Sequence, residues 1–318
     1  MSDRATIPPR RRWPLAAATL AALAVGAAPR SAHADGTPAP ASSDAPAKKR
    51  VEWNPDWPRF RIWEYAGTAV VGGASIYLYR YVSPPAEPKW HGNNFFDDKI
   101  RDWLVADGRD GRESAGQVGN ILSWGGAAVP FVIDLPLIAL AHRQPGLAWQ
   151  VLMMDLEAEA VSGFIKNLLF VEAGRARPSF ADCAADRNYD ALCGSPSNNA
   201  SFPSGHTANI AVAAGLTCVH HHYLPIYGQP AADAGVCVLL SAATVVTAIT
   251  RVISDRHFTT DAIAGAALGF GTGYGLPWLL HYRYGGPPGR PGALLATRPV
   301  LLPIATGHGL GLGMLWAM

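Results

Sequence analysis

The chain has 318 residues, of which 49% are hydrophobic and 16% are charged, and its formal net charge is +2. This length allows one domain with a large buried core. No basic run with interleaved aromatic residues follows the N-terminus, so a nucleic acid is not expected as a partner.

The first 34 residues have the pattern of an export signal peptide. Three arginines at 10–12 precede an apolar run at 13–28, and Ala-His-Ala at 32–34 is a small-residue cleavage pattern. An N-terminal anchor that is never cut is the alternative, but the short Ala-rich run favours cleavage. Residues 35–58 are rich in Pro, Ala and Ser, which predicts a disordered tether. We therefore expect an exported protein, in the periplasm or on the outer face of the cell envelope.

Apolar segments of helical length follow, and they predict an all-α domain over residues 59–284 with a core bundle of six helices. The third segment carries three carboxylates, Asp155, Glu157 and Glu159, which we expect to be solvated or paired. Residues 285–318 read as a Gly- and Pro-rich linker and a tail in which a short β-hairpin is expected. The six segments lie at 65–82, 116–142, 146–170, 207–224, 234–253 and 261–281.

Membrane placement is left open by the sequence. Few of the segments reach the roughly 20 uninterrupted apolar residues that a span needs. The two alternatives are an integral bundle whose first helix does not cross, and an exported bundle that is not fully embedded. The second is preferred, because the short loops at 142–145 and 225–233 hold a single basic residue, Arg143, and give no positive-inside signal.

Polar residues are concentrated where the last two segments meet. Arg251, His257 and Asp261 stand within one short stretch, and His257 and Asp261 share a face if a helix begins there. A carboxylate beside an imidazole fixes its tautomer and leaves the other ring nitrogen free as a base or nucleophile. Arg251 offers a fork of donors to a phosphate. For this stretch alone, an interhelical salt bridge is an equally good explanation.

A second polar stretch, residues 201–207, precedes the fourth segment. Pro203 ends any preceding helix, and Ser204 is a natural N-cap. Gly205 leaves backbone N–H groups uncovered at the start of the helix, which favours an anion there. His206 would lie in the first turn and face that anion.

Three ordered motifs resemble the signatures of the type 2 phosphatidic acid phosphatase superfamily, which includes lipid phosphate phosphatases, class A bacterial acid phosphatases and vanadium haloperoxidases. They are Arg-Pro at 177–178, Pro-Ser-Gly-His at 203–206, and Arg251 followed by His257 and Asp261 at the family spacing. The resemblance covers roughly residues 60–282 and implies the family's helical bundle.

The first motif departs from the family pattern, because Phe170 stands where the family has Lys. Lys166 lies one helical turn earlier on the same face, from which its side chain could reach the site.

The resemblance implies an exported phosphatase that hydrolyses phosphate monoesters, with lipid phosphates or diphosphates preferred over soluble esters as substrates. It implies that His257 attacks phosphorus and forms a phosphohistidine, that Asp261 orients it, and that His206 protonates the leaving group. No cofactor or metal is expected. The groups that would hold the phosphate oxygens are Arg177, Ser204, Gly205 and Arg251, with Lys166 in place of the family lysine.

Two alternatives remain. A vanadium-dependent haloperoxidase would use the same pocket for vanadate, and a non-catalytic envelope protein would only bind phosphate. The absence of the family lysine weighs against the first and keeps the second open.

The four cysteines agree with export. Cys183 and Cys193 flank a polar loop between the first two motifs and are predicted to form a disulfide. Cys218 and Cys237 lie in apolar segments and are predicted to be inert core thiols. The run at 220–222 is three histidines, which point in different directions on a helix and so do not predict a metal site.

Overall fold

The computed structural model describes residues 51–91, 95–286, 300–306 and 309–315. The described part contains eight α-helices, and α3 continues through two π-helical segments, Pro130–Asp134 and Leu137–Ala141. Prolines at 130 and 136 remove N–H donors from this stretch, which fits the change of helical pitch. The helices are α1 (Ile62–Tyr81), α2 (Phe95–Leu104), α3 (Arg109–Val129), α4 (Pro145–Ala173), α5 (Phe180–Ala185), α6 (Gly205–Tyr223), α7 (Pro230–Ile253) and α8 (Thr259–Leu280).

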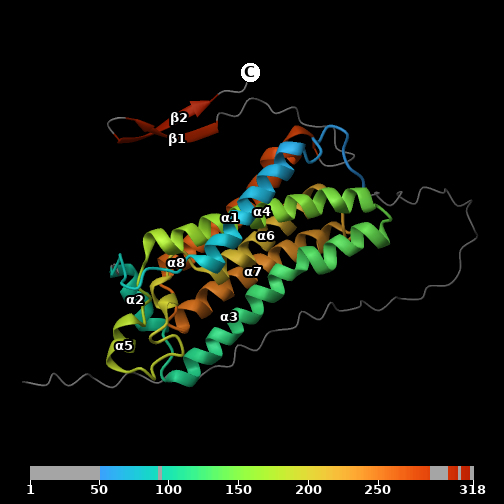
Figure 1. Ribbon diagram of the computed structural model, residues 1–318. Helices are drawn as coiled ribbons and strands as arrows, with labels where there is room; N and C mark the ends of the chain where they lie inside the picture. Colours follow the sequence, from blue (N-terminus) through green and yellow to red (C-terminus); the bar gives the residue numbers. More distant parts are fainter. Residues whose placement is uncertain (1–50, 92–94, 287–299, 307–308, 316–318) are drawn as a thin grey trace, which may run out of the picture. The chain divides into compact units, whose positions relative to one another are not determined.

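The six predicted core helices are confirmed as α1, α3 with its π-helical continuation, α4, α6, α7 and α8. Helix α6 is central: it packs against α3, α4, α7 and α8, and most of its residues are buried, whereas α1 packs on α4. The short helices α2 and α5 lie together at one end of the bundle (Figure 1). Neither helix contains a long apolar run, so neither is predicted from the sequence.

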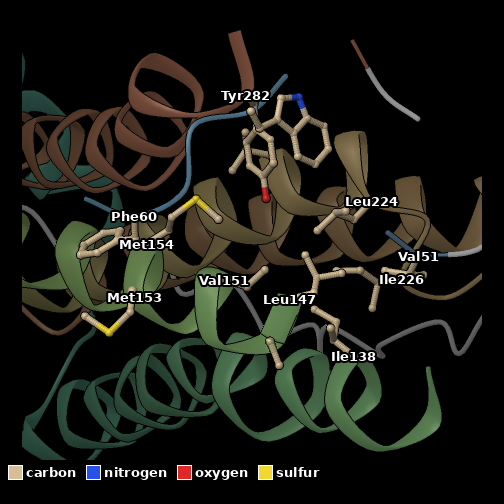
Figure 2. Packing of buried hydrophobic residues seen from close by; sticks show 13 residues of the cluster. Val51, Phe60, Ile138, Leu147, Val151, Met153, Met154, Leu224, Ile226 and Tyr282 are labelled. Carbon is tan, nitrogen blue, oxygen red and sulfur yellow. The ribbon is translucent and has the colours of Figure 1, made fainter. Parts of the chain in front are cut away.

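A hydrophobic cluster fills the half of the bundle away from α2 and α5. It joins side chains from α4, such as Leu147 and Met154, to Tyr282 after α8 and to Val51 before α1 (Figure 2). Trp57 belongs to the same cluster and donates its indole N–H to the carbonyl of Gly285 at 2.9 Å.

The prediction of a disordered tether over residues 35–58 is therefore wrong for residues 51–58, where Val51 and Trp57 are each only 2% exposed. Apolar side chains scattered in a Pro-rich stretch gave no periodic signal, yet they dock on the end of the bundle. The start of the domain moves from residue 59 to 51 or earlier. Residues 1–50, with the predicted signal peptide, and 287–299 of the predicted linker lie outside the described residues.

Two disulfides link the four cysteines. Cys183 and Cys193 are bonded, as predicted. The prediction of inert thiols at Cys218 and Cys237 is wrong, because these residues form a second disulfide between α6 and α7. Apolar surroundings suggested buried thiols, but the packing of α6 on α7 brings their Cα atoms to 4.7 Å.

Many large hydrophobic side chains are exposed on the surface of the bundle. Large hydrophobic side chains point outward from α1, α3, α7 and α8, including Val70, Ile121 and Leu140 at 71%, 71% and 76% exposed. Two described helical segments, Arg109–Ala141 and Pro230–Ile253, are long and apolar enough to cross a membrane.

The C-terminal stretch contains two strands, β1 (Val300–Thr306) and β2 (Gly309–Leu315), which pair antiparallel as a two-stranded ribbon. They lie in the segment where the sequence analysis expects a hairpin.

Candidate active site

A cavity of about 700 Å³ lies where the ends of α4 and α6 meet the loop between α7 and α8. One end is polar and brings together five residues that the sequence analysis singled out, which come from three separate motifs. The other walls come from α1, α3, α4 and the π-helical turn after α3, and they are largely apolar apart from Ser75, Glu159 and Asn167. The predicted site residues that line the polar end are Lys166, Arg177, Gly205, His206 and His257.

His257 is held by a backbone carbonyl. Its Nδ1 lies 2.7 Å from the carbonyl oxygen of Ser201. A carbonyl oxygen only accepts, so Nδ1 carries the proton and Nε2 keeps its lone pair. Nε2 faces Arg177, whose Nη1 lies 3.4 Å away. The nitrogen that is free for chemistry therefore borders the cavity.

Burial lowers the pKa of His257 well below its usual value, and the neighbouring guanidinium groups of Arg177 and Arg251 lower it further. The imidazole is neutral at neutral pH as a result. A neutral ring with an exposed lone pair at Nε2 is the form that a nucleophile needs.

Asp261 does not orient His257 directly, which corrects the sequence-based expectation. Its Oδ2 lies 4.0 Å from His257 Nδ1, too far for a hydrogen bond. Asp261 instead accepts from the Ser201 hydroxyl at 2.6 Å and from the Phe258 backbone N–H at 2.9 Å. Asp261 thus fixes the position of Ser201, and the carbonyl of Ser201 fixes the orientation of His257. Asp261 is therefore a positioning residue that acts on His257 through Ser201.

A buried arginine anchors this arrangement. Arg175 is 1% exposed, pairs with Asp261 and Asp97, and has its guanidinium between the rings of Trp90 and Phe258 at 4.1 and 4.2 Å. Asp97, in α2, also accepts from the N–H and hydroxyl of Thr260 in the first turn of α8. The supporting role of Asp97 is not predicted from the sequence. Its spacing from Arg175 carries no signal, since 78 positions separate them.

The two predicted phosphate-binding arginines differ in position. Arg177 lines the cavity, and its Nε and Nη1 donate to the carbonyls of Ser197 and Arg256 at 2.9 and 2.6 Å. Burial lowers the pKa of Arg177 to about 10. Arg251 is not among the residues that line the cavity, because its Nη1 donates to α3, at the Gly116 carbonyl and the Asn120 side chain.

Ser204 is not among the residues that line the cavity. Its hydroxyl pairs with Thr207 at 2.9 Å, and its N–H donates to the Asp261 carbonyl, so neither group is free for a phosphate. Gly205 lines the cavity, where a Cβ atom would press on the ring of Phe170 at 3.2 Å. Of the predicted Ser204–Gly205 anion site, only the Gly205 half faces the cavity.

Lys166 reaches the cavity that the sequence analysis assigned to it. Its Nζ donates to Asn209 in α6 at 3.0 Å, and both side chains line the polar end. Phe170 lines the same region one turn later. The ammonium of Lys166 and the guanidinium of Arg177 therefore border one space beside the two histidines.

Residues 148–284 match the model of the PAP2 superfamily. The chain carries a PAP2 superfamily domain. The matched stretch contains α6, α7, α8 and most of α4, and with them every residue of the polar end of the cavity. No curated protein and no solved structure matches the chain. The PAP2 superfamily consists mostly of phosphatases, so a phosphate ester is the class of substrate to consider.

Two other histidines of the PAP2 domain are held by polar partners. His220 lies between Asp155 and Tyr282 at 2.9 and 2.8 Å, and His221 lies between Asp233 and Asp134. The three consecutive histidines thus point in different directions, as predicted. Asp155 is paired, and the prediction for that carboxylate is confirmed.

Proposed function

We propose that the protein is a phosphatase that hydrolyses phosphate monoesters carried by lipids, through a phosphohistidine formed at His257. The observation that carries this proposal is the geometry of His257: Nδ1–H is tied to the Ser201 carbonyl and Nε2 faces a cavity lined by Arg177, Lys166 and His206. One nucleophile and two cations then surround the place where a phosphate group would sit.

The first step forms a bond between Nε2 of His257 and phosphorus and breaks the bond between phosphorus and the alcohol oxygen. Burial and the neighbouring cations lower the pKa of His206, so this step requires the negative charge of the bound phosphate to offset those cations and let His206 take up a proton. His206 then gives that proton to the alcohol oxygen. Arg177 and Lys166 stabilise the negative charge on the transferring group, and such electrostatic stabilisation is the main contribution to catalysis of phosphoryl transfer.

The second step regenerates the enzyme. A water molecule attacks phosphorus, the phosphorus–nitrogen bond breaks, and His206 accepts the proton from the water. His257 returns to its neutral form with the proton still on Nδ1, because the Ser201 carbonyl continues to hold it.

The apolar part of the cavity supports a lipid substrate. Its walls include Ile76 and Tyr79 of α1 and Trp124 of α3, which are 64%, 73% and 64% exposed. The cavity therefore reaches the lateral surface between α1 and α3. A hydrocarbon chain can lie there while its phosphate occupies the polar end, whereas a soluble ester leaves this surface in water.

The exposed hydrophobic side chains around the bundle support a place in a lipid bilayer, rather than the exported, partly embedded bundle preferred from the sequence. Such an apolar surface is costly in water and favourable in a hydrocarbon layer. The two disulfides, Cys183–Cys193 and Cys218–Cys237, support an oxidising compartment for at least part of the protein.

Purified protein with its disulfides intact tests the proposed chemistry. Rapid quenching with radiolabelled lipid phosphate is expected to trap an acid-labile phosphoenzyme in the wild type and none in His257→Ala. His206→Ala is expected to lose activity on alkyl esters at least tenfold and to retain more of it on aryl esters, whose leaving groups need no proton. His222→Ala, an exposed histidine outside the cavity, is the matched control.

A phosphoenzyme of unchanged yield in His257→Ala would overturn the assignment of the nucleophile. If the protein oxidised halide only with added vanadate and hydrolysed no ester, it would be a haloperoxidase and not a phosphatase. If the protein bound phosphate but hydrolysed no lipid or soluble ester, it would be a phosphate-binding protein without phosphatase activity.

A further inference from the structure

Three buried side chains of kinds that can bind a metal ion lie close together, near the first and last residues of the helical domain. Glu64 lies in the first turn of α1, Glu157 in α4, and His281 directly after α8. One ligand atom from each lies within 4.8 Å of the others, and none of these residues lines the catalytic cavity. The three positions are far apart in the sequence, so no spacing pattern could have indicated the cluster.

The imidazole of His281 has the tautomer that a metal requires. Its Nδ1 donates to the Pro58 carbonyl at 2.8 Å, which leaves a lone pair on Nε2. Histidine ligands commonly donate their other ring N–H to a backbone carbonyl in this way. The side chain is 0% exposed, and Nε2 has no hydrogen-bond partner within the described residues.

The spacing of the ligand atoms fits an ion better than a direct contact. His281 Nε2 lies 3.7 Å from Glu64 Oε1. A hydrogen bond would bring these atoms to about 2.7–3.2 Å. Two ligands at about 2.0–2.2 Å from one Zn²⁺ ion in tetrahedral geometry lie about 3.4 Å apart.

Glu157 brings a second carboxylate that needs a cation. The residue is 8% exposed, and its Oε2 is buried without a hydrogen-bond partner among the described residues. Arg61 donates to both carboxylate oxygens of Glu64, at 3.0 and 2.7 Å. Oε2 of Glu64 also accepts from the backbone N–H of Arg61, so Oε1 is the oxygen that keeps a second lone pair for a metal. Glu157 gains no hydrogen bond from Arg61 among the described residues.

We propose that Glu64, Glu157 and His281 bind one divalent transition-metal ion, with Zn²⁺ the best match to two carboxylates and an imidazole. A water molecule would complete a tetrahedral site. The ion joins α1, α4 and the end of α8, so its role is to stabilise the bundle and not to take part in phosphoryl transfer. The proposal is independent of the proposed function.

The test uses full-length protein purified through an affinity tag without histidines, equilibrated with ZnCl₂ and then dialysed. Elemental analysis is expected to find about one zinc per chain, and zinc is expected to raise the unfolding temperature above that of chelator-treated protein. Both effects are expected to disappear in His281→Ala and in the nearly isosteric Glu157→Gln. His222→Ala, an exposed histidine, is expected to keep both.

Two results would overturn the proposal. One is wild-type protein without stoichiometric zinc, whose unfolding temperature does not respond to zinc or to a chelator. A protonated Glu157 would then account for the cluster. The other is zinc content in Glu157→Gln and His281→Ala equal to that of the wild type. Absorption bands of Co²⁺ in unmodified wild-type protein give a readout that needs no variant to fold: intense visible bands support a tetrahedral site, and their absence contradicts it.

Discussion

At the scale of single residues, the feature that organises the site is the carbonyl of Ser201. It fixes the tautomer of His257, while the hydroxyl of the same residue donates to Asp261. The motif residues could be predicted from the sequence because their side-chain chemistry and spacing are distinctive. The role of Ser201 could not, because every residue has a backbone carbonyl and only the folded chain decides which one meets the imidazole.

The replacement of the family lysine by Phe170 leads to a first prediction. Lys166→Ala is expected to lower phosphatase efficiency at least tenfold, because the transferring phosphoryl group loses one of the cations that line its space. Phe170→Lys in that background is expected to restore part of the loss. Initial rates on a lipid phosphate measure both effects.

Lys89→Ala is the matched control, because this lysine is half exposed and its Nζ bonds the Val171 carbonyl outside the cavity. Circular dichroism checks that each variant folds. If Lys166→Ala were as efficient as Lys89→Ala, Lys166 would have only its structural bond to Asn209, and Arg177 would hold the phosphate without it.

At the scale of elements, the site depends on how closely α8 approaches α6. Three glycines lie four residues apart on α8, at positions 265, 269 and 273. A Cβ atom on any of them would collide with a backbone carbonyl of α6 or of Ser204, the residue that precedes α6. The carbonyls are those of Ser204, Ala208 and Val212, in the same order. Small residues at this spacing let two helices pack backbone to backbone. The close approach keeps His206 of α6 near His257, which lies two residues before α8.

The helices themselves could be predicted because their apolar runs are long. Their neighbours could not, and this is why the bond between Cys218 and Cys237 was missed: it depends on α6 lying beside α7 at one particular register. The same holds for α2, whose contribution to the site is Asp97 and whose ten residues carry no extended apolar pattern.

A pair of glycines on α8 provides the second prediction. Gly269→Ala is expected to destabilise the protein by about 1–3 kcal/mol, because the new methyl group overpacks the contact with α6. Gly271→Ala is its matched control: nothing lies within 4 Å of a Cβ there, so the gain in helix propensity is expected to stabilise by roughly 0.5–1 kcal/mol. Thermal unfolding of both variants in the same detergent measures the difference. Equal shifts would mean that α8 packs less closely on α6 than described.

At the scale of the whole molecule, ionisable side chains are buried inside the bundle and large apolar side chains are exposed on its surface. Charged groups such as Asp155 and Glu157 are buried between helices, while Ile121 and Leu140 face outward. The sequence alone could not reveal this, because a helix that is apolar on most sides can lie either in a protein core or in a membrane. Only the packing partners of each face decide between the two.

A substitution on this outer surface provides the third prediction. Ile121→Lys is expected to reduce the stability and yield of the membrane-inserted protein, since a lysine in the hydrocarbon layer costs about 2.5–3.5 kcal/mol on insertion scales. The wild type is expected to remain with membranes after an alkaline carbonate wash and to require detergent for release. Wild-type protein released by carbonate, with Ile121→Lys equally stable, would contradict a bilayer location, because exposed surface substitutions in water usually change stability by less than about 0.5 kcal/mol.

The contact between Asn54 and Gly286, at 2.9 Å, brings the beginning and the end of the described helical domain together, away from the residues that line the polar end of the cavity. If all six long helices cross a bilayer, the even number of crossings puts these two points on the same side in either orientation. A reporter enzyme fused directly after Gly286 would therefore report the side of the bilayer on which both of these points lie. In that arrangement the phosphate-binding end of the cavity lies on the opposite side of the bilayer from Gly286. The compartment in which the reporter is active would therefore also show to which side the active site opens. A single fusion would give this orientation without any probe that has to enter the active site.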